Sequence, residues 1–272
     1  MQNLHELIRR RAWLRQCALG LSGLIPAVRA QGLPGKPVQL AAASDLKFAL
    51  AHLIKQFQQE TGREVSASFG SSGNLARQIR QGLPVDLFMS ADEGFVFQLA
   101  DAGLTRTFPG TAGLDRGVLY ALGRIALYLP QGSPIPLDAG LAGLRAQWHR
   151  VHKFAMANPE HAPYGRAARE ALEGLGLWDM VRPKLVLGEN IAQATQFVAT
   201  GAAQAGITAL SLALAPEVAQ QGRHVALPAH LHAPLRQRMV LLQSAPAAAV
   251  ALYDFLQSGA AREVFRRYGF SV

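Results

Sequence analysis

The chain has 272 residues, a formal net charge of +9 and a single cysteine, Cys17. With one cysteine it can form neither an internal disulfide nor a metal site built from several thiolates. Its 27 lysines and arginines are scattered rather than clustered with aromatic residues, so the positive charge does not predict a nucleic-acid surface.

Residues 1–30 have the layout of a secretory signal peptide. Arginines crowd the start, an apolar stretch covers 17–28, and the small residue Ala30 follows. The stretch is too short, and too interrupted by Gly and Pro, to span a bilayer as a stable anchor. We therefore predict a periplasmic protein whose mature chain begins at Gln31. It lacks cysteine and has a formal charge of +5, because cleavage removes five arginines and one glutamate from a chain of charge +9.

The segment Arg10-Arg11-Ala12-Trp13-Leu14-Arg15 is also similar to the twin-arginine export signal. Arg9 stands where that signal usually has Ser or Thr, so the sequence leaves the export route open. An amphipathic helix at the start of the mature protein is the alternative to a signal peptide. The abrupt end of the pattern at residues 31–35 argues against that helix.

Apolar segments alternate with helical patterns after residue 37, which predicts an α/β protein with mostly parallel strands. The predicted strands are 38–43, 64–69, 86–90, 124–129, 154–157, 184–187, 205–208 and 238–242. The predicted helices are 45–60, 75–81, 95–102, 165–175, 192–200, 247–257 and 260–267. Glycines that tolerate positive φ are expected at helix ends, and the candidates are Gly62, Gly82, Gly103, Gly201 and Gly259.

Two serines lie where a predicted strand gives way to a predicted helix. Strand 38–43 runs into Ser44, and strand 64–69 is followed by Gly70-Ser71-Ser72-Gly73 and a helix. Such corners direct free N–H groups, hydroxyls and the positive end of a helix dipole at one point, which suits a small anion. The simpler alternative is that Ser44 and Ser72 only cap their helices, a common role for serine.

Two further corners of this kind lie in the second half of the chain. Residues 158–165 follow strand 154–157, and residues 188–191 follow strand 184–187. Ligands of open α/β sheets collect at the carboxyl ends of the strands. A rigid loop would explain 158–165 alone, but four corners, two in each half, together predict an oxyanion site.

The mature chain carries a series of segments in a characteristic order: Ala41-Ala42-Ala43-Ser44, then 68–79 (SFGSSGNLARQI), 84–92 (PVDLFMSAD), 158–165 (NPEHAPYG) and 260–270 (AAREVFRRYGF). This series resembles the molybdate-binding proteins that serve ABC transporters. The resemblance extends over essentially the whole mature chain.

The resemblance implies a two-lobed periplasmic-binding-protein fold of type II, in which each lobe is a mainly parallel sheet flanked by helices and the ligand lies in the cleft between lobes. It places lobe one at 38–121 plus 230–272 and lobe two at 122–229. It also implies a monomer that is not an enzyme and has no cofactor. Such a protein binds molybdate, and tungstate with it, and delivers the anion to an inner-membrane permease.

The resemblance carries over four contacts to the oxyanion. Ser44 and Ser72 would contribute hydroxyls and backbone N–H groups from lobe one, and Tyr164 and the N–H of Ile191 would contribute from lobe two. These are contacts to the oxygen atoms and not direct metal ligands. Asn190 is a possible additional contact.

One position departs from part of the family. Some members place a tyrosine where this chain has Ala209, and others place it in the Ala-Pro-Tyr-Gly turn, as here at Tyr164. We therefore expect the Tyr164 phenol to donate the missing hydrogen bond. If it packs inside the lobe instead, the site loses a bond worth about 1.5–3 kcal/mol.

Asp45 is the residue that bears most on ligand choice. In the first turn of a predicted helix, it is expected to face solvent and complement the helix dipole. The alternative is that it accepts the proton of a protonated oxyanion such as phosphate. A fully ionised dianion carries only acceptors and is best held by donors alone.

Other functions meet specific obstacles. The spacing in 70–73 is not the Gly-x-Ser-x-Gly elbow of a hydrolase, and no GxxxxGK[ST] motif is present for phosphoryl transfer. Six histidines lack cysteine or acidic company for zinc and are expected to be exposed: His149, His152, His161, His224, His230 and His232. Sulfate or phosphate in place of molybdate is the main alternative, and a hydrolase or transferase on the same fold is a remoter one.

Overall fold

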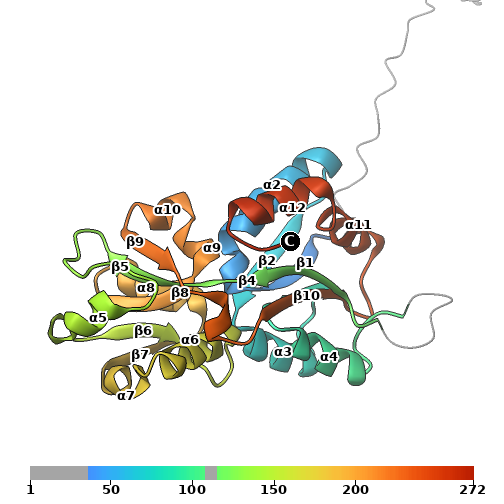
Figure 1. The fold of residues 1–272 in the computed structure, drawn as a ribbon. Coiled ribbons are helices and arrows are strands. Elements are labelled where there is room, and N and C mark those ends of the chain that lie inside the picture. Colours follow the sequence, from blue (N-terminus) through green and yellow to red (C-terminus); the bar gives the residue numbers. More distant parts are fainter. Residues whose placement is uncertain (1–35, 108–114) are drawn as a thin grey trace, which may run out of the picture. The chain divides into compact units, whose positions relative to one another are not determined.

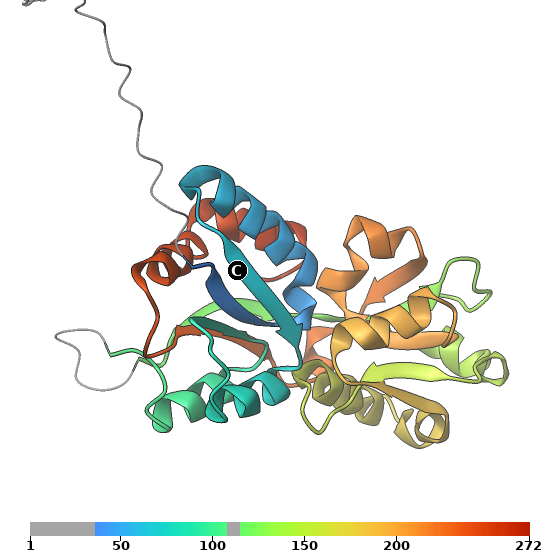
Figure 2. The same ribbon diagram turned by 180° about the vertical axis from the view of Figure 1, so that it is seen from behind.

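A computed structural model describes residues 36–107 and 115–272. The predicted signal peptide, residues 1–30, lies outside them. The described residues form two five-stranded sheets, each with helices on both faces (Figures 1 and 2). We call the first sheet with its helices lobe one and the second sheet with its helices lobe two. The two-lobed α/β architecture is the predicted one.

Lobe one has the strand order β2-β1-β3-β10-β4. Strand β1 pairs in parallel with β2 and β3, whereas β10 pairs antiparallel with β3 and β4. The strands are β1 Val38–Ala43, β2 Val65–Gly70, β3 Leu87–Ser90, β4 Val118–Gly123 and β10 Leu235–Leu241. The helices are η1 Ser44–Leu46, α2 Lys47–Thr61, α3 Ser72–Arg80, α4 Glu93–Asp101, α11 Ala247–Phe255 and α12 Gly259–Arg267.

Lobe two has the strand order β7-β6-β8-β5-β9. Strand β6 pairs in parallel with β7 and β8, and β5 pairs antiparallel with β8 and β9. The strands are β5 Ile125–Pro130, β6 Phe154–Ala157, β7 Leu185–Gly188, β8 Ala205–Ala209 and β9 Gly222–Ala226. The helices are α5 Ala142–Ala146, η2 Trp148–Arg150, α6 Pro163–Gly174, α7 Trp178–Val181, η3 Arg182–Lys184, α8 Ile191–Ala199, α9 Leu210–Ala213, α10 Pro216–Ala219 and η4 Ala229–Leu231.

The sheets are mixed, where the sequence predicted mainly parallel strands. Each antiparallel pairing between two of the described strands involves β5 or β10. Both strands follow a crossing from one lobe to the other, at 123–125 and 226–235. A parallel strand needs a crossover connection, usually a helix, that brings the chain back to the starting edge of the same sheet. Neither β5 nor β10 is preceded by a crossover helix of its own sheet. The exact lobe limits of 38–121 with 230–272 and 122–229 stay predictions.

Helix α2 shows how a predicted apolar stripe becomes buried. In α2 the buried residues Ala49, Leu50, Leu53 and Phe57 recur at helical spacing and pack into the core of lobe one. Its end is capped by Gly62 at φ 68°. Gly259 is the exception among the five predicted glycines, because it begins α12 under a Ser258 cap and has no positive φ.

Gly165 fixes how closely α6 approaches the end of β6. A Cβ there would lie 2.3 Å from the carbonyl oxygen of Ala157, the last residue of β6. The next nearest atoms are the carbonyl carbons of Ala157 and Asn158, so the Cβ would meet backbone and no flexible side chain. Glycine therefore allows the first turn of α6, which includes Tyr164, to lie against the strand end.

We predict that Gly165→Ala lowers the free energy of unfolding by about 1–3 kcal/mol, because the added methyl group forces the helix away from the strand. Gly174→Ala is the matched control, since it lies in the same helix and a Cβ there meets nothing within 4 Å. It should be neutral or stabilise by up to about 1 kcal/mol. Urea unfolding measures both, and equal midpoints for the two variants would contradict the close approach.

Candidate functional site

The four predicted strand-to-helix corners meet at one small cavity between the sheets. Its volume is about 10 Å³, which is room for about one water molecule. The residues that line it are Ala43, Ser44, Asp45, Gly70, Ser71, Ser72, Ala91, Ala162, Pro163, Tyr164 and Ile191. The structure thus brings together Ser44, Ser72, Tyr164 and Ile191 from both lobes.

The Ser72 hydroxyl is held in place by a backbone group. Ser72 is the first residue of α3 and is 1% exposed, and its Oγ accepts a hydrogen bond of 2.9 Å from the N–H of Ala91. Ser71, the residue before the helix, directs its own Oγ to Nδ1 of His161 at 2.9 Å. Since no described acceptor takes the Ser72 proton, the hydroxyl is free to donate into the cavity.

Ser44 plays the equivalent part at the end of β1. Its Oγ accepts a hydrogen bond of 3.3 Å from the N–H of Ala192, in the first turn of α8 in the other lobe. The N–H of Ile191, the first residue of α8, has no acceptor among the described residues. The alternative that Ser44 and Ser72 are helix caps is therefore wrong, because neither hydroxyl accepts from its own helix.

The sequence led us to expect that the Tyr164 phenol donates a hydrogen bond to the anion. In the structure its proton points elsewhere. It is 2% exposed, donates to Oδ2 of Asp45 at 2.9 Å and accepts from Nε2 of Gln237 at 3.0 Å. Tyr164 still lines the cavity, but its hydroxyl connects lobe two to a carboxyl of lobe one. The prediction of a phenol donor to the anion is corrected by this bond.

Asp45 is buried, and the expectation that it faces solvent is wrong. It is 1% exposed and lines the cavity. Its Oδ2 accepts from Tyr164 and, at 2.6 Å, from Nε2 of Gln237, while Oδ1 has no donor among the described residues. Burial outweighs these hydrogen bonds and raises the pKa of Asp45 from 3.8 to about 6.

Sequence reasoning missed three residues that hold Asp45 in place: Gln237 and Ser211 bond to it directly, and Tyr120 acts through Gln237. Gln237 is fully buried in β10, and its Oε1 accepts from the Tyr120 hydroxyl at 2.7 Å. The Ser211 hydroxyl donates to the backbone oxygen of Asp45 at 2.8 Å. A signal was available for Gln237, because it shares the inward-facing register of β10 with Leu235 and Met239.

Asn190, the possible additional contact, is not among the residues that line the cavity. Its Oδ1 accepts from the N–H of Gln193 at 3.0 Å and so caps α8. Further contacts join the lobes at the rim: Gly73 donates to the backbone oxygen of His161 at 3.0 Å, and Asn74 donates to Glu189 at 3.2 Å. The cleft is closed in this structure.

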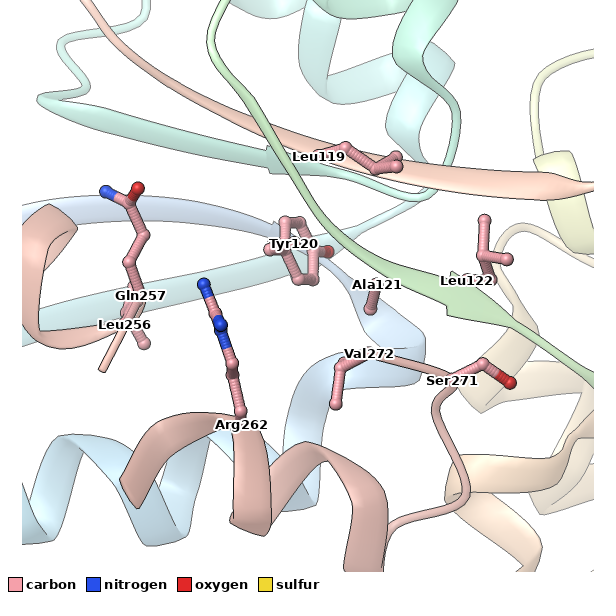
Figure 3. Close-up of a pocket in the computed structure, with 9 residues that line it drawn as sticks. All are labelled: Leu119, Tyr120, Ala121, Leu122, Leu256, Gln257, Arg262, Ser271 and Val272. Atoms are coloured by element: carbon pink, nitrogen blue, oxygen red, sulfur yellow. The ribbon is translucent and has the colours of Figure 1, made fainter. Parts of the chain in front are cut away.

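A larger hollow lies elsewhere in lobe one, beside β4 (Figure 3). It has a volume of about 450 Å³ and is lined mostly by apolar side chains, with Arg262 and Gln257 on one side. It lacks the serine hydroxyls held by backbone N–H groups that line the small cavity. We therefore take the small cavity as the candidate site.

Among residues 36–107 and 115–272, no group of three or more His, Cys, Asp or Glu side chains could hold a metal ion. His232 is buried, with Nδ1 against the backbone oxygen of Ala233, and His161 and His224 are half-buried, so the expectation that the six histidines are exposed is wrong at these three positions. Within the same residues, no helix is long and apolar enough to cross a membrane.

The pKa of Asp45 predicts how stability changes with pH. The unfolded chain gives up this proton near pH 3.8 and the folded protein near pH 6, so ionisation favours the unfolded chain as pH rises through this window. Without ligand, Asp45→Asn should therefore raise the free energy of unfolding at pH 8 by up to about 3 kcal/mol. The gain should vanish below about pH 4. Urea unfolding across this pH range measures it.

Asp86→Asn is the control for this prediction. Asp86 accepts from the N–H of Gln39 in lobe one and does not line the cavity. Its variant should show no gain that grows with pH. An Asp45→Asn protein no more stable than wild type at pH 8 would contradict the cost assigned to the buried carboxylate.

Comparison with known proteins places this geometry in a family. The profile described as "Bacterial extracellular solute-binding protein" matches residues 38–271. The "Molybdate-binding protein ModA" of Azotobacter vinelandii is 35% identical over 86% of this chain and 90% of its own length. The protein of the same name from Rhodobacter capsulatus is 36% identical over 79% of this chain and 80% of its own length.

Solved structures give the same answer. The structure titled "Azotobacter vinelandii periplasmic molybdate-binding protein" superimposes with a TM-score of 0.76 at 28% identity, covering 86% of this chain and 99% of that one. The family is one of solute-binding proteins and not of enzymes. The chain therefore belongs to the bacterial extracellular solute-binding proteins.

Proposed function

We propose that this protein binds molybdate, and tungstate with it, outside the cytoplasm and delivers the anion to the permease of an ABC transporter. The observation that carries the proposal is the convergence of four strand-to-helix corners, two from each lobe, on one small cavity. The names of the relatives with a third of their residues in common supply the identity of the anion.

The donors of the cavity suit a fully ionised tetrahedral dianion. Such an anion has only acceptors, and the Ser44 and Ser72 hydroxyls and the Ile191 N–H have protons to give. No Lys, Arg or His is among the described residues that line the cavity. Neutral donors at helix starts bind a dianion with little reorganisation, because backbone and hydroxyl dipoles already point at it.

Binding would stabilise the closed arrangement of the lobes. The hydrogen bond from Ala192 to Ser44 and that from Tyr164 to Asp45 each join one lobe to the other at the cavity wall. An anion that contacts Ser72 on one side and Ile191 on the other adds a further bridge, so it shifts the population towards closure. The closed protein would then dock on the permease, as a monomer and without a cofactor.

The proposed location is the periplasm. The family is extracellular by its description, and residues 1–30 carry the signal-peptide pattern with a twin-arginine-like segment. Cell fractionation tests the location, and the N-terminal sequence of the exported protein tests cleavage after residue 30.

Another tetrahedral oxyanion is the second candidate, because the buried Asp45 carboxyl could accept the proton of hydrogen phosphate. Titration calorimetry of the purified protein with molybdate, tungstate, sulfate and phosphate separates the candidates. We expect tight one-to-one binding of molybdate and tungstate and little heat from the other two. Heat from phosphate alone would overturn the proposed ligand.

Ser72 tests the site itself. Ser72→Ala removes one hydroxyl donor to a charged group, which should weaken molybdate binding by about 10- to 100-fold. Ser72→Asp should abolish binding, because it directs a negative charge at the dianion. Ser66→Asp, at an exposed position of β2, is the control for added charge and should bind as wild type does. Wild-type affinity in both Ser72 variants would place the anion elsewhere.

A further inference from the structure

The two carboxyl oxygens of Asp45 differ in their hydrogen bonds. Its Oδ2 accepts two hydrogen bonds, from the Tyr164 hydroxyl at 2.9 Å and from Nε2 of Gln237 at 2.6 Å. Its Oδ1 is buried and receives no donor from the described residues. If the carboxyl carries a proton, that proton belongs on Oδ1, because both acceptor positions of Oδ2 are occupied.

The orientation of Gln237 is fixed by a second bond. The Tyr120 hydroxyl donates to its Oε1 at 2.7 Å, so the amide presents its NH₂ group to Asp45. Tyr120, Gln237 and Tyr164 therefore form a chain of donors that ends on Oδ2. These hydrogen bonds leave Oδ1 as the carboxyl oxygen of Asp45 without a partner among the described residues.

No described cation offsets a negative charge on Asp45. The titratable groups that face it are the phenols of Tyr120 and Tyr164, and burial keeps both neutral by raising the pKa of each well above its usual value. Helix α9 contributes the Ser211 hydroxyl, and α8 contributes no charged side chain to the cavity wall. The nearest lysine in sequence, Lys47, lies over the ring of Phe48 at 5.6 Å.

An ionised Asp45 is therefore incompatible with a dianion in the same cavity. Both charges are negative, both are shielded from solvent, and their repulsion is strong where water is excluded. A neutral Asp45 removes that repulsion. Its O–H at Oδ1 then adds one more donor to a wall that Ser44, Ser72 and Ile191 already supply with donors.

We propose that Asp45 takes up one proton from solvent when the site binds a tetrahedral dianion, so that anion affinity is coupled to pH. The proton balance is simple: the carboxylate, one proton and the dianion give the carboxylic acid hydrogen-bonded to the dianion. This coupling rests on the proposed function in requiring an anion in this cavity, but not on which dianion it is.

The coupling predicts a definite pH dependence. The free carboxyl titrates at about pH 6, so above that pH each binding event must collect a proton. Affinity should fall about tenfold for each pH unit, or about 100-fold between pH 7 and pH 9. Close to one proton should be taken up per anion bound over this range.

The experiment is calorimetry of the purified protein with molybdate, tungstate and sulfate at pH 7, 8 and 9. These three anions are fully ionised throughout the range, so any proton taken up goes to the protein. Repeating each titration in two buffers of different ionisation enthalpy gives the number of protons taken up. This count is made on the wild-type protein and does not depend on a variant folding.

Asp45→Asn identifies the residue. The Asn oxygen can accept from Tyr164 and Gln237, and its NH₂ group can donate in place of the O–H. The variant should bind with no proton uptake and no pH slope, and at pH 9 it should bind at least tenfold tighter than wild type. Asp86→Asn, which leaves the cavity untouched, should keep the wild-type slope.

The outcomes separate the two proposals. Molybdate binding with no pH slope and no proton uptake would overturn the coupling and leave the proposed function standing, and so would an Asp45→Asn variant that keeps the wild-type slope. A slope with sulfate but no molybdate binding would support the coupling and overturn the proposed ligand. Failure of all three anions to bind at every pH would overturn both.

Discussion

The described donors that line the cavity, Ser44, Ser72 and Ile191, each lie where a strand ends and a helix begins. The site depends on this short connection from strand to helix. The starts of η1, α3, α6 and α8 meet there from two separate sheets. A helix start can approach so closely only where side chains allow it. Gly165 meets this need, because a Cβ there would lie 2.3 Å from the backbone of β6.

The same arrangement brings the positive ends of several helix dipoles to the cavity, and none of the described residues that line the cavity is positively charged. Ser44 and Ser72 use their oxygen atoms to accept backbone N–H groups, and this fixes the hydroxyls with their protons left to give. Asp45 is the one carboxyl among the described residues that line the cavity, so it governs how the wall responds to pH. Tyr164 links that carboxyl to the other lobe, which ties the state of the site to closure of the cleft.

The sequence predicted the parts of the fold that local signals determine. Predicted strand ends followed by predicted helix starts located all four corners, and Gly62 marked a helix end at positive φ as expected. The short strands β4 and β9 were missed. The antiparallel entry of β5 and β10 was also missed, because strand direction depends on where the chain crosses between lobes and not on local pattern.

The errors at the site have one physical origin. For Asp45 and Tyr164 the sequence argument considered only the helix start on which each residue lies, where a solvent-facing carboxyl and an inward phenol are both reasonable. The structure packs the two side chains against each other from opposite lobes and adds Gln237 from a strand almost 200 residues away in sequence, at a separation of 192. Contacts of such long range leave no local trace, apart from a glutamine in an apolar register.

The most direct test of the account is a crystal structure of the protein grown with tungstate, whose tungsten atom can be located by its anomalous scattering. The account predicts one tungsten atom in the small cavity, with its oxygen atoms at hydrogen-bond distance from the Ser44 and Ser72 hydroxyls and the Ile191 N–H. Tungsten bound instead in the apolar hollow beside Arg262, with the small cavity empty, would contradict it.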